Sequence, residues 1–361
     1  MATVTYQLPA GTVVGNRYRI ERILGEGGYG ITYYAMDLRL DLPVAIKEFF
    51  PAFWVSRYSE KTTQVQYAPD NYQDFEKGIM RFYEEATTLA HLYMIPEIVL
   101  VRDFFRDNNT AYLVMEYLYG KNLKQMTDGF GGRIPPHILM SVMDPLIKAL
   151  AKVHAKDMIH RDISPDNIMM LENGNTKLLD FGNARDTSDN KSMTLAMKEG
   201  FAAPEQYRSK GQGTWTDVYG VCATIYYCLT GKLPMQAMER LTGGEFLTPT
   251  QLGVDLPKHQ EDAIMQGLDL FVRNRIQNME ELWERLYVAP VQQSSVYQQS
   301  ESTIQEPTTT ILTQSTETDG KLSGICSSQE LRSESQHTGY RDQNVSFKDI
   351  CIHIFRKLKD R

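Results

Sequence analysis

Acidic and amide side chains of this sequence occur in short patterns that suit chemistry on a phosphate group. Residues 160–167 read H-R-D-I-S-P-D-N, so that Asn167 follows Asp162 by five positions. Asp180 opens the triplet D-F-G thirteen residues after Asn167. Carboxylate and amide carbonyl oxygens are the ligands that Mg²⁺ prefers in proteins. Asn167 and Asp180 therefore offer oxygen atoms of the kind that suits Mg²⁺.

Lys47 ends the segment V-A-I-K, residues 44–47, and has apolar neighbours. A lysine in such a place needs an anionic partner, because burying an unpaired ammonium is costly. The helical pattern at residues 75–92 offers Glu84 and Glu85. Glu85 is favoured because Leu89, four residues later, lies on the same inward face. For Lys47 taken alone, a solvent-facing side chain remains the alternative.

A glycine cluster precedes this lysine. Residues 25–30 read G-E-G-G-Y-G, and the β-branched and aromatic residues 31–34 continue a strand beyond it. A dinucleotide-binding fingerprint would run into a helix instead, so the pattern predicts the tip of a hairpin. Glycines at such a tip allow backbone N–H groups to approach phosphate oxygens. A tight turn without a ligand is the alternative.

The elements that must position these residues follow from periodicity. Alternating apolar residues predict strands in the first third of the chain, whereas steps of three and four predict helices, which dominate beyond Gly120. The predicted strands are 17–24, 31–36, 43–48, 98–105 and 111–116, and the predicted helices are 75–92, 138–155 and 218–229. The sequence thus predicts an α+β fold with a small strand-rich lobe and a larger helical lobe.

Composition excludes several classes of protein. The 361 residues include 38 Lys and Arg against 45 Asp and Glu, a net charge of −7, which argues against nucleic acid as a partner. Four scattered cysteines form no CxxC pair, so we expect neither a disulfide framework nor a zinc site. The sequence contains no long apolar run and no signal-peptide pattern, and we expect a cytoplasmic protein.

The ordered set of motifs resembles the protein Ser/Thr kinase family, in particular its bacterial eukaryotic-like (Hanks-type) branch. The set comprises the glycine loop, V-A-I-K, H-R-D-x-x-x-x-N, D-F-G and A-P-E at residues 203–205. The resemblance covers about residues 18–286. It implies a bilobal protein-kinase-like fold, in which the small lobe is an antiparallel sheet with one helix.

The resemblance also implies roles for these residues. Asp162 would accept or orient the proton of the substrate hydroxyl, Lys47 would hold the α- and β-phosphates of ATP, and Glu85 would hold Lys47. Two Mg²⁺ ions would be bound by Asn167 and Asp180. The remaining nucleotide-binding positions belong to the glycine loop, the adenine site and the hinge between the lobes: Leu24, Gly25, Gly27, Gly28, Gly30, Thr32, Ala45, Met115, Glu116, Leu118 and Met169.

Two further residues of the larger lobe match family positions. Arg275 matches the arginine that pairs with the glutamate of A-P-E, which implies a buried Glu205–Arg275 ion pair. Asp217 opens the helix expected after this motif, and ordinary helix capping explains an aspartate there equally well.

The catalytic segment, residues 160–167, departs from the family pattern at one position. Most Ser/Thr kinases carry a lysine two residues after the H-R-D aspartate, where this chain has Ser164, and Lys198 aligns with the usual threonine before A-P-E. We interpret this as an exchange, in which Lys198 supplies the cation and Ser164 the hydroxyl. A solvent-facing Lys198 is the alternative.

The interval between Lys47 and Glu85 is longer than is usual in the family. Residues 48–74 are rich in Phe, Trp and Tyr, which predicts packing against the small lobe or, alternatively, contact with a partner.

The activation segment, residues 180–205, contains candidate phosphorylation sites. Arg161 could bind a phosphate on Ser192 or Thr194, with Thr187 and Ser188 as further hydroxyls.

We therefore predict an ATP- and Mg²⁺-dependent kinase that phosphorylates Ser or Thr of a protein substrate and also itself. A pseudokinase scaffold and a small-molecule phosphotransferase are the alternatives, and A-P-E with its following helix favours a protein substrate.

The predicted organisation has four parts. An N-terminal extension (1–16) precedes the kinase domain (17–288), whose lobes are 17–117 and 118–288. Residues 289–346, rich in Ser, Thr and Gln, predict a disordered tail. Residues 347–361 predict a short basic amphipathic helix that either is solvated or contacts a membrane surface or a partner.

Overall fold

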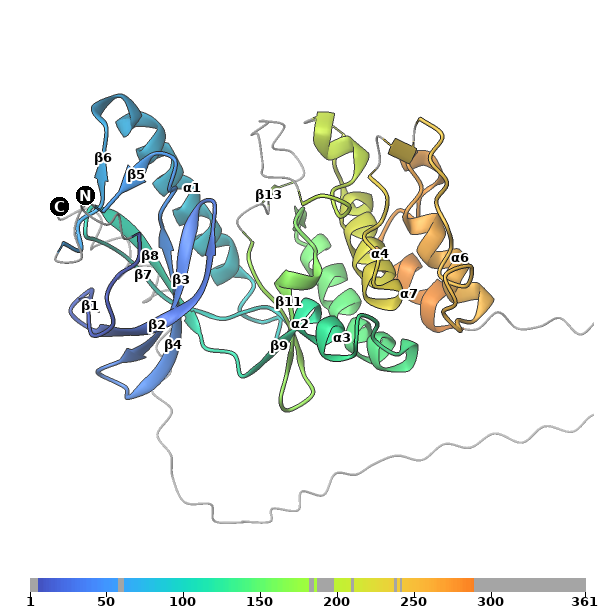
Figure 1. The fold of residues 1–361 in the computed structure, drawn as a ribbon, viewed down its shortest axis with the longest axis horizontal. Coiled ribbons are helices and arrows are strands. Elements are labelled where there is room, and N and C mark those ends of the chain that lie inside the picture. Colours follow the sequence, from blue (N-terminus) through green and yellow to red (C-terminus); the bar gives the residue numbers. More distant parts are fainter. Residues whose placement is uncertain are drawn as a thin grey trace, which may run out of the picture. The chain divides into compact units, whose positions relative to one another are not determined.

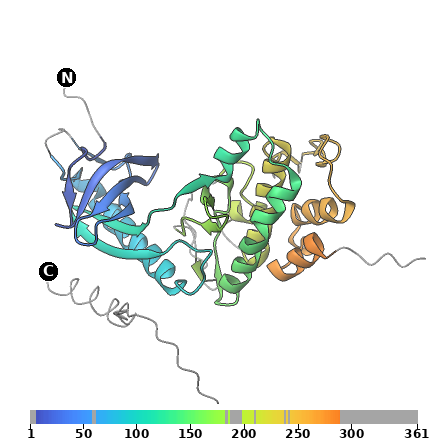
Figure 2. The same ribbon diagram turned by 90° about the horizontal axis from the view of Figure 1, so that it is seen from below.

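The computed structural model describes residues 6–57, 62–181, 185–186, 198–208, 211–236, 239–240 and 242–288. These residues form two lobes, one rich in strands and one rich in helices (Figures 1 and 2). The α+β bilobal fold predicted from the sequence is therefore confirmed. The predicted tail (289–346) and terminal helix (347–361) lie outside the described residues. None of the described helices combines the length and apolar character that crossing a membrane requires.

The small lobe contains a six-stranded antiparallel sheet of order β1-β2-β3-β4-β8-β7. Its side chains alternate between the two faces, as in β3, where Ile31, Tyr33 and Ala35 are buried. The strands are β1 (Val13–Val14), β2 (Tyr18–Gly27), β3 (Gly30–Asp37), β4 (Leu42–Phe49), β7 (Val101–Asp107) and β8 (Thr110–Glu116). This alternation is what made the strands predictable from the sequence.

Helix α1 (Tyr72–His91) packs against β7 and β8 of this sheet. Its buried residues recur at steps of three and four, and they include Phe75, Ile79, Phe82 and Leu89. Glu85 belongs to the same buried face. The helix begins three residues before the predicted start, and it carries Glu85 toward the sheet.

The large lobe is mainly helical. Helix α4 (Thr214–Thr230) is buried along most of its length and is capped by Gly231, whose φ of 70° is typical of a glycine at this position. The helices are α2 (Leu123–Gly129), α3 (Pro136–His154), α4 (Thr214–Thr230), α6 (Lys258–Gly267) and α7 (Met279–Tyr287). The large lobe also contains two small sheets. One comprises β9 (Gly120–Asn122), β11 (Ile168–Leu171) and β12 (Thr176–Leu178), and the other pairs β10 (Met158–Ile159) with β13 (Arg185–Asp186). Short 3₁₀ turns are η1 (Pro69–Asn71), η2 (Pro165–Asn167), η3 (Pro204–Arg208) and η4 (Val272–Asn274).

The described part of the insertion at residues 48–74 packs on its own lobe. It forms a two-stranded hairpin of β5 (Val55–Ser56) and β6 (Gln66–Tyr67). Phe50, Val55 and Val65 are buried in the common core. Of the two interpretations of this aromatic segment, packing against the small lobe is the one that the structure shows.

A buried ion pair fastens the insertion to the sheet. Arg57 of the insertion donates to Glu48 of β4, and the two side chains are 1% and 0% exposed. The hydroxyls of Tyr33 and Tyr112 also donate to Glu48, at 2.9 and 2.7 Å. Burial would lower the pKa of Arg57, but the Glu48 carboxylate outweighs it and the pKa is raised. Because the carboxylate accepts from three side chains, its burial is compensated.

Candidate active site

Lys47 lies where residues from distant parts of the chain meet. Its ammonium donates to Glu85 Oε1 at 2.8 Å and to Asp180 Oδ1 at 2.9 Å. Strand β4 presents Lys47, helix α1 presents Glu85, and Asp180 follows β12 of the large lobe. The structure thus brings a lysine of one motif and an aspartate of another into direct contact, and it places Glu85 rather than Glu84 against the lysine.

The charges of this cluster support one another. Burial would lower the pKa of Lys47, but the carboxylates of Asp180 and Glu85 outweigh it, so that the pKa is raised and the lysine is cationic. Burial raises the pKa of Glu85 to about 7, against the opposing effect of Lys47. Lys47 is therefore a fixed positive charge between the lobes.

The segment at residues 160–167 holds Asp162 and Asn167 together. The amide nitrogen of Asn167 donates to the backbone oxygen of Asp162 at 2.8 Å and to its Oδ2 at 3.2 Å. Burial raises the pKa of Asp162, whereas Lys198 opposes that rise. A carboxylate with a raised pKa is a better proton acceptor near neutral pH.

The donor set of Asn167 and Asp180 fits a magnesium ion. Because the amide nitrogen of Asn167 donates to Asp162, the atom of this side chain that would bind a metal is its carbonyl oxygen. The Asp180 side chain is 41% exposed and so is accessible to an ion. In the described part of the chain, no group of three or more His, Cys, Asp or Glu side chains is placed to hold a metal by itself. Mg²⁺ typically binds one or two carboxylates and completes its shell with waters and substrate phosphates, so that few protein ligands suffice.

Lys198 contacts the catalytic segment. Its ammonium donates to Ser164 Oγ at 2.8 Å and lies 3.7 Å from Asp162 Oδ1. One third of the side chain is exposed, so it is neither buried nor directed wholly to solvent. The two residues at which the chain departs from the family pattern are thus hydrogen-bonded to each other.

Asp217 does not cap helix α4, contrary to one of the two interpretations of the sequence. Helix α4 begins three residues earlier, and its N-cap is Gly213. The buried Asp217 carboxylate instead accepts from the backbone N–H groups of His160 and Arg161, both at 2.8 Å, and lies 2.8 Å from His154 Nε2. Burial would raise the pKa of Asp217. The hydrogen bond and electrostatic interaction with His154 and the backbone bond from His160 outweigh burial, so that the pKa is lowered. Asp217 therefore holds the segment that contains Asp162.

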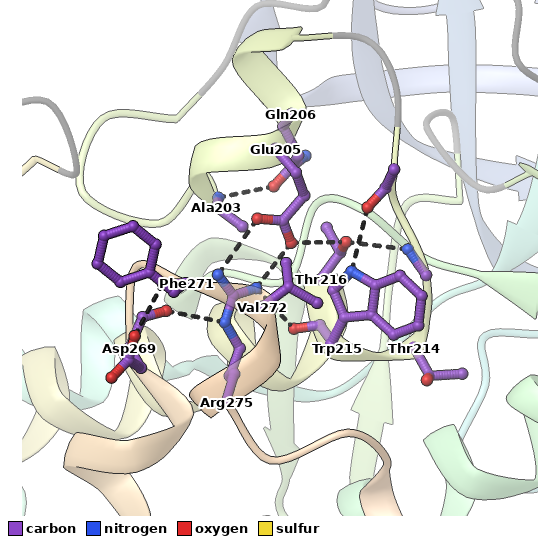
Figure 3. Close-up of polar contacts among 12 residues, drawn as sticks. Ala203, Glu205, Gln206, Thr214, Trp215, Thr216, Asp269, Phe271, Val272 and Arg275 are labelled. Carbon is purple, nitrogen blue, oxygen red and sulfur yellow. Dashed lines mark hydrogen bonds and ion pairs between the residues drawn. The ribbon is translucent and has the colours of Figure 1, made fainter.

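The Glu205–Arg275 ion pair lies in the large lobe (Figure 3). Arg275 Nη1 donates to Glu205 Oε1 at 2.7 Å and Nη2 donates to Oε2 at 3.2 Å. Arg275 also donates to the backbone oxygens of Trp215 and Asp269, and Thr216 Oγ1 donates to Glu205 at 2.9 Å. The guanidinium is fully buried, so its charge depends on these partners. The pair joins η3 to the residue that follows η4, and the bonds to Thr216 and Trp215 connect it to the start of α4.

The remaining predicted nucleotide-binding residues lie mainly on neighbouring strands of the small lobe. In the register of the sheet, Ala45 pairs with Met115, while Thr32 pairs with Gly25 and Lys47. Gly30 lies so close to β4 that a Cβ there would be 2.5 Å from Glu48 O. Leu24 and Gly27 are on β2, Gly28 is at the hairpin tip, Glu116 ends β8, Leu118 follows it, and Met169 is on β11.

Sequence reasoning missed two residues that connect parts of the site. Gln206 bridges η3 and the catalytic segment, because its amide donates to Arg161 O and accepts from Ala203 N, both at 2.9 Å. Lys177 of β12 donates to Glu116 Oε1 at 2.6 Å, and so joins the large lobe to the hinge. No local pattern in the sequence distinguishes Gln206 or Lys177 from other polar residues. The predicted phosphorylation sites Thr187, Ser188, Ser192 and Thr194 lie outside the described residues.

Comparison with known proteins agrees with this geometry. Residues 18–262 match the family model described as protein kinase domain. A probable serine/threonine-protein kinase of Clostridium acetobutylicum is 30% identical over 285 residues, which cover 76% of this chain and 40% of that protein. The serine/threonine-protein kinase PknL of Mycobacterium bovis is 30% identical over 259 residues, covering 71% of this chain and 58% of PknL.

A relative of known structure matches as well. PpkA-294 in its apo form has a TM-score of 0.69 and 29% identity, and the match covers 78% of this chain and all of that chain. The chain spans less than two thirds of the length of the two curated relatives above. The matched family model covers more than half of the 361 residues. The chain therefore belongs to the protein kinase family, in its bacterial serine/threonine kinase branch.

Proposed function

We propose that the protein is a serine/threonine kinase that transfers the γ-phosphoryl group of Mg-ATP to a hydroxyl of a protein substrate. One observation carries this proposal: Lys47 Nζ contacts Glu85 and Asp180 at 2.8 and 2.9 Å. An ammonium held in this way is positioned to bind phosphate oxygens. The names of the curated relatives support the same class of reaction.

The chain's own residues have distinct tasks in this proposal. Lys47 binds the α- and β-phosphates, and Glu85 orients it. Asp162 orients the substrate hydroxyl and accepts its proton, while Asp217 keeps the backbone beside Asp162 in place. Asn167 and Asp180 would hold Mg²⁺, which when bound neutralises charge on the phosphates. Phosphoryl transfer depends on positioning and charge neutralisation more than on covalent help from the protein.

Labelled ATP distinguishes this proposal from its alternatives. The purified protein is incubated with labelled ATP, Mg²⁺ and a generic basic protein, beside the Asp162→Asn variant. A kinase labels the protein in an Asp162-dependent manner, whereas a pseudokinase labels nothing. A small-molecule phosphotransferase labels an added aminoglycoside or choline but not the protein.

Lys198 is proposed to replace the missing catalytic-segment lysine. We expect Lys198→Thr to lower kcat about 10²-fold, the effect of removing one donor that stabilises developing charge. The family arrangement, Ser164→Lys with Lys198→Thr, should recover most of this loss, because the two positions are hydrogen-bonded to each other. Lys156→Ala, at an exposed lysine of the same lobe, serves as the control. If Lys198→Ala leaves turnover unchanged while Lys47→Ala abolishes it, the exchange is wrong.

Autophosphorylation is proposed for the activation segment. A phosphate on Ser192 or Thr194 would add about −1.5 to −2 charge and could pair with Arg161. Mass spectrometry after incubation with Mg-ATP should find phosphate between residues 187 and 194 in the wild type and none in Asp162→Asn. Labelling confined to the Ser- and Thr-rich tail would contradict this site assignment.

A further inference from the structure

The insertion reaches the tip of the glycine loop. The ring of Phe53 meets the ring of Tyr29 edge to face, with centroids 5.4 Å apart, and Trp54 packs on Phe53 at 4.7 Å. The backbone N–H of Phe50 donates to Tyr29 O at 3.0 Å. Tyr29 is the residue between Gly28 and Gly30. A segment outside the kinase motifs therefore touches the part of the loop that would cover the phosphates.

This contact has a rigid support. The backbone N–H groups of Trp54 and Val55 both donate to Pro51 O, at 2.8 and 3.1 Å, which closes a turn that presents Phe53. Phe50 and Val55 on either side are buried. The guanidinium of Arg57 lies over the Phe50 ring at 4.8 Å and is fastened to Glu48. Phe53 thus projects from a turn whose base is part of the core.

Strand β2 of the glycine hairpin is held by the N-terminal residues 6–8. Gln7 donates to Glu26 of β2, next to Gly25 and Gly27. The backbone N–H of Leu8 donates to Tyr33 Oη at 3.1 Å, and Tyr6 O accepts from Arg57 at 2.6 Å. Residues 6–8 and the insertion therefore share the buried Arg57 anchor, and they contact β2 and the tip of the glycine loop, respectively.

The rings of Phe53 and Tyr29 are both partly exposed, so their contact is not part of the core packing. Phe53 is 57% exposed and Tyr29 is 43% exposed, so their contact contributes little to burying the core. A loop with four glycines has unusually large conformational freedom, and ordering it on a ligand lowers the affinity for that ligand. A contact that restricts the loop before the ligand binds would remove part of this cost.

We propose that residues 50–57 brace the glycine loop for the nucleotide, with Phe53 acting through Tyr29 as a positioning residue. This inference rests on the proposed kinase function, because it takes the ligand of the loop to be ATP. The proposed positioning residue lies in the insertion and not in one of the family's motifs. The effect is on nucleotide binding and not on the transfer step.

The test is Phe53→Ala in the full chain. We expect KM for ATP and the Kd of a non-hydrolysable ATP analogue to rise about two- to tenfold, the worth of one aromatic pair, with kcat nearly unchanged. In the nucleotide-free protein, hydrogen exchange of residues 26–30 should become faster while exchange of α4 stays the same. Tyr72→Ala is the matched control, since Tyr72 is an exposed aromatic of the same insertion whose ring neighbour is Tyr67. It should change none of these values.

A double-mutant cycle shows whether Phe53 acts through Tyr29. The effects of Phe53→Ala and Tyr29→Ala on the analogue Kd should not add, and Phe53→Tyr should restore the wild-type value. Additive effects, or a Phe53→Ala variant with unchanged Kd and unchanged loop exchange, would overturn the brace. Hydrogen exchange of the nucleotide-free protein needs no turnover. A failure of the kinase proposal, seen as absent phosphate transfer by the wild type, is thus distinguishable from a failure of the brace.

Discussion

Replacing Asp162 with Asn should lower kcat for phosphate transfer about 10²- to 10⁴-fold, the usual contribution of a positioned proton acceptor. The amide cannot take the proton of the substrate hydroxyl, although it has the size of the carboxylate. The Kd for ATP should stay close to that of the wild type, because the residues proposed to bind phosphate and metal are retained. Initial rates with labelled ATP and a calorimetric titration with the nucleotide measure the two quantities.

The matched control is Asp166→Asn in the same segment. The Asp166 side chain is 44% exposed and lies 3.9 Å from Lys124, so its replacement should change the rate far less. Similar losses in both variants would mean that the segment responds to any change of charge. An Asp162→Asn variant with wild-type kcat would exclude Asp162 as the proton acceptor.

Removing one partner of the Glu205–Arg275 pair should lower the free energy of unfolding by about 3–5 kcal/mol. Glu205→Ala leaves the fully buried guanidinium of Arg275 without its carboxylate, and Arg275→Ala strands Glu205 in the same way. Arg275→Ala also leaves the backbone oxygens of Trp215 and Asp269 without their donor (Figure 3). Urea denaturation followed by circular dichroism measures the change in unfolding free energy.

An exposed ion pair supplies the comparison for this prediction. Glu281 and Arg285 of α7 are 2.6 Å apart, but their side chains are 33% and 44% exposed. Arg285→Ala should therefore cost no more than about 1 kcal/mol. Equal losses from Arg275→Ala and Arg285→Ala would show that burial of the Glu205–Arg275 pair is energetically unimportant.

Much of the fold was predictable because its signals are local. The alternation in β3 and the three- and four-residue steps in α1 each occupy one stretch of sequence. Glu85 was preferred to Glu84 on the same basis, and it is the residue that contacts Lys47. The start of α4 was harder to predict from the sequence, because Asp217 resembles an N-cap residue but lies within the helix.

Contacts between distant segments could be predicted from the sequence only where family motifs identify the partners. The pairing of Lys47 with Asp180 joins residues 133 positions apart, and no periodicity relates them. The resemblance to protein kinases implied that both residues serve the same nucleotide, but it did not predict their direct contact. It did predict the pairing of Glu205 with Arg275. For Gln206, Lys177 and Arg57 the chain contains no such motif, and their contacts were not anticipated.

Local patterns in the sequence specify the main strands of the small lobe and the helices α1, α3 and α4, together with the residue types available for phosphate and metal chemistry. Three contacts depend on the packing of distant elements: Lys198 with Ser164, Asp217 with the backbone beside Asp162, and Phe53 with Tyr29. Secondary structure follows from the spacing of apolar residues within a few turns, whereas these contacts depend on how separate elements pack. Burial and partner geometry then set the charge and position of each side chain, and neither can be obtained from neighbours along the chain.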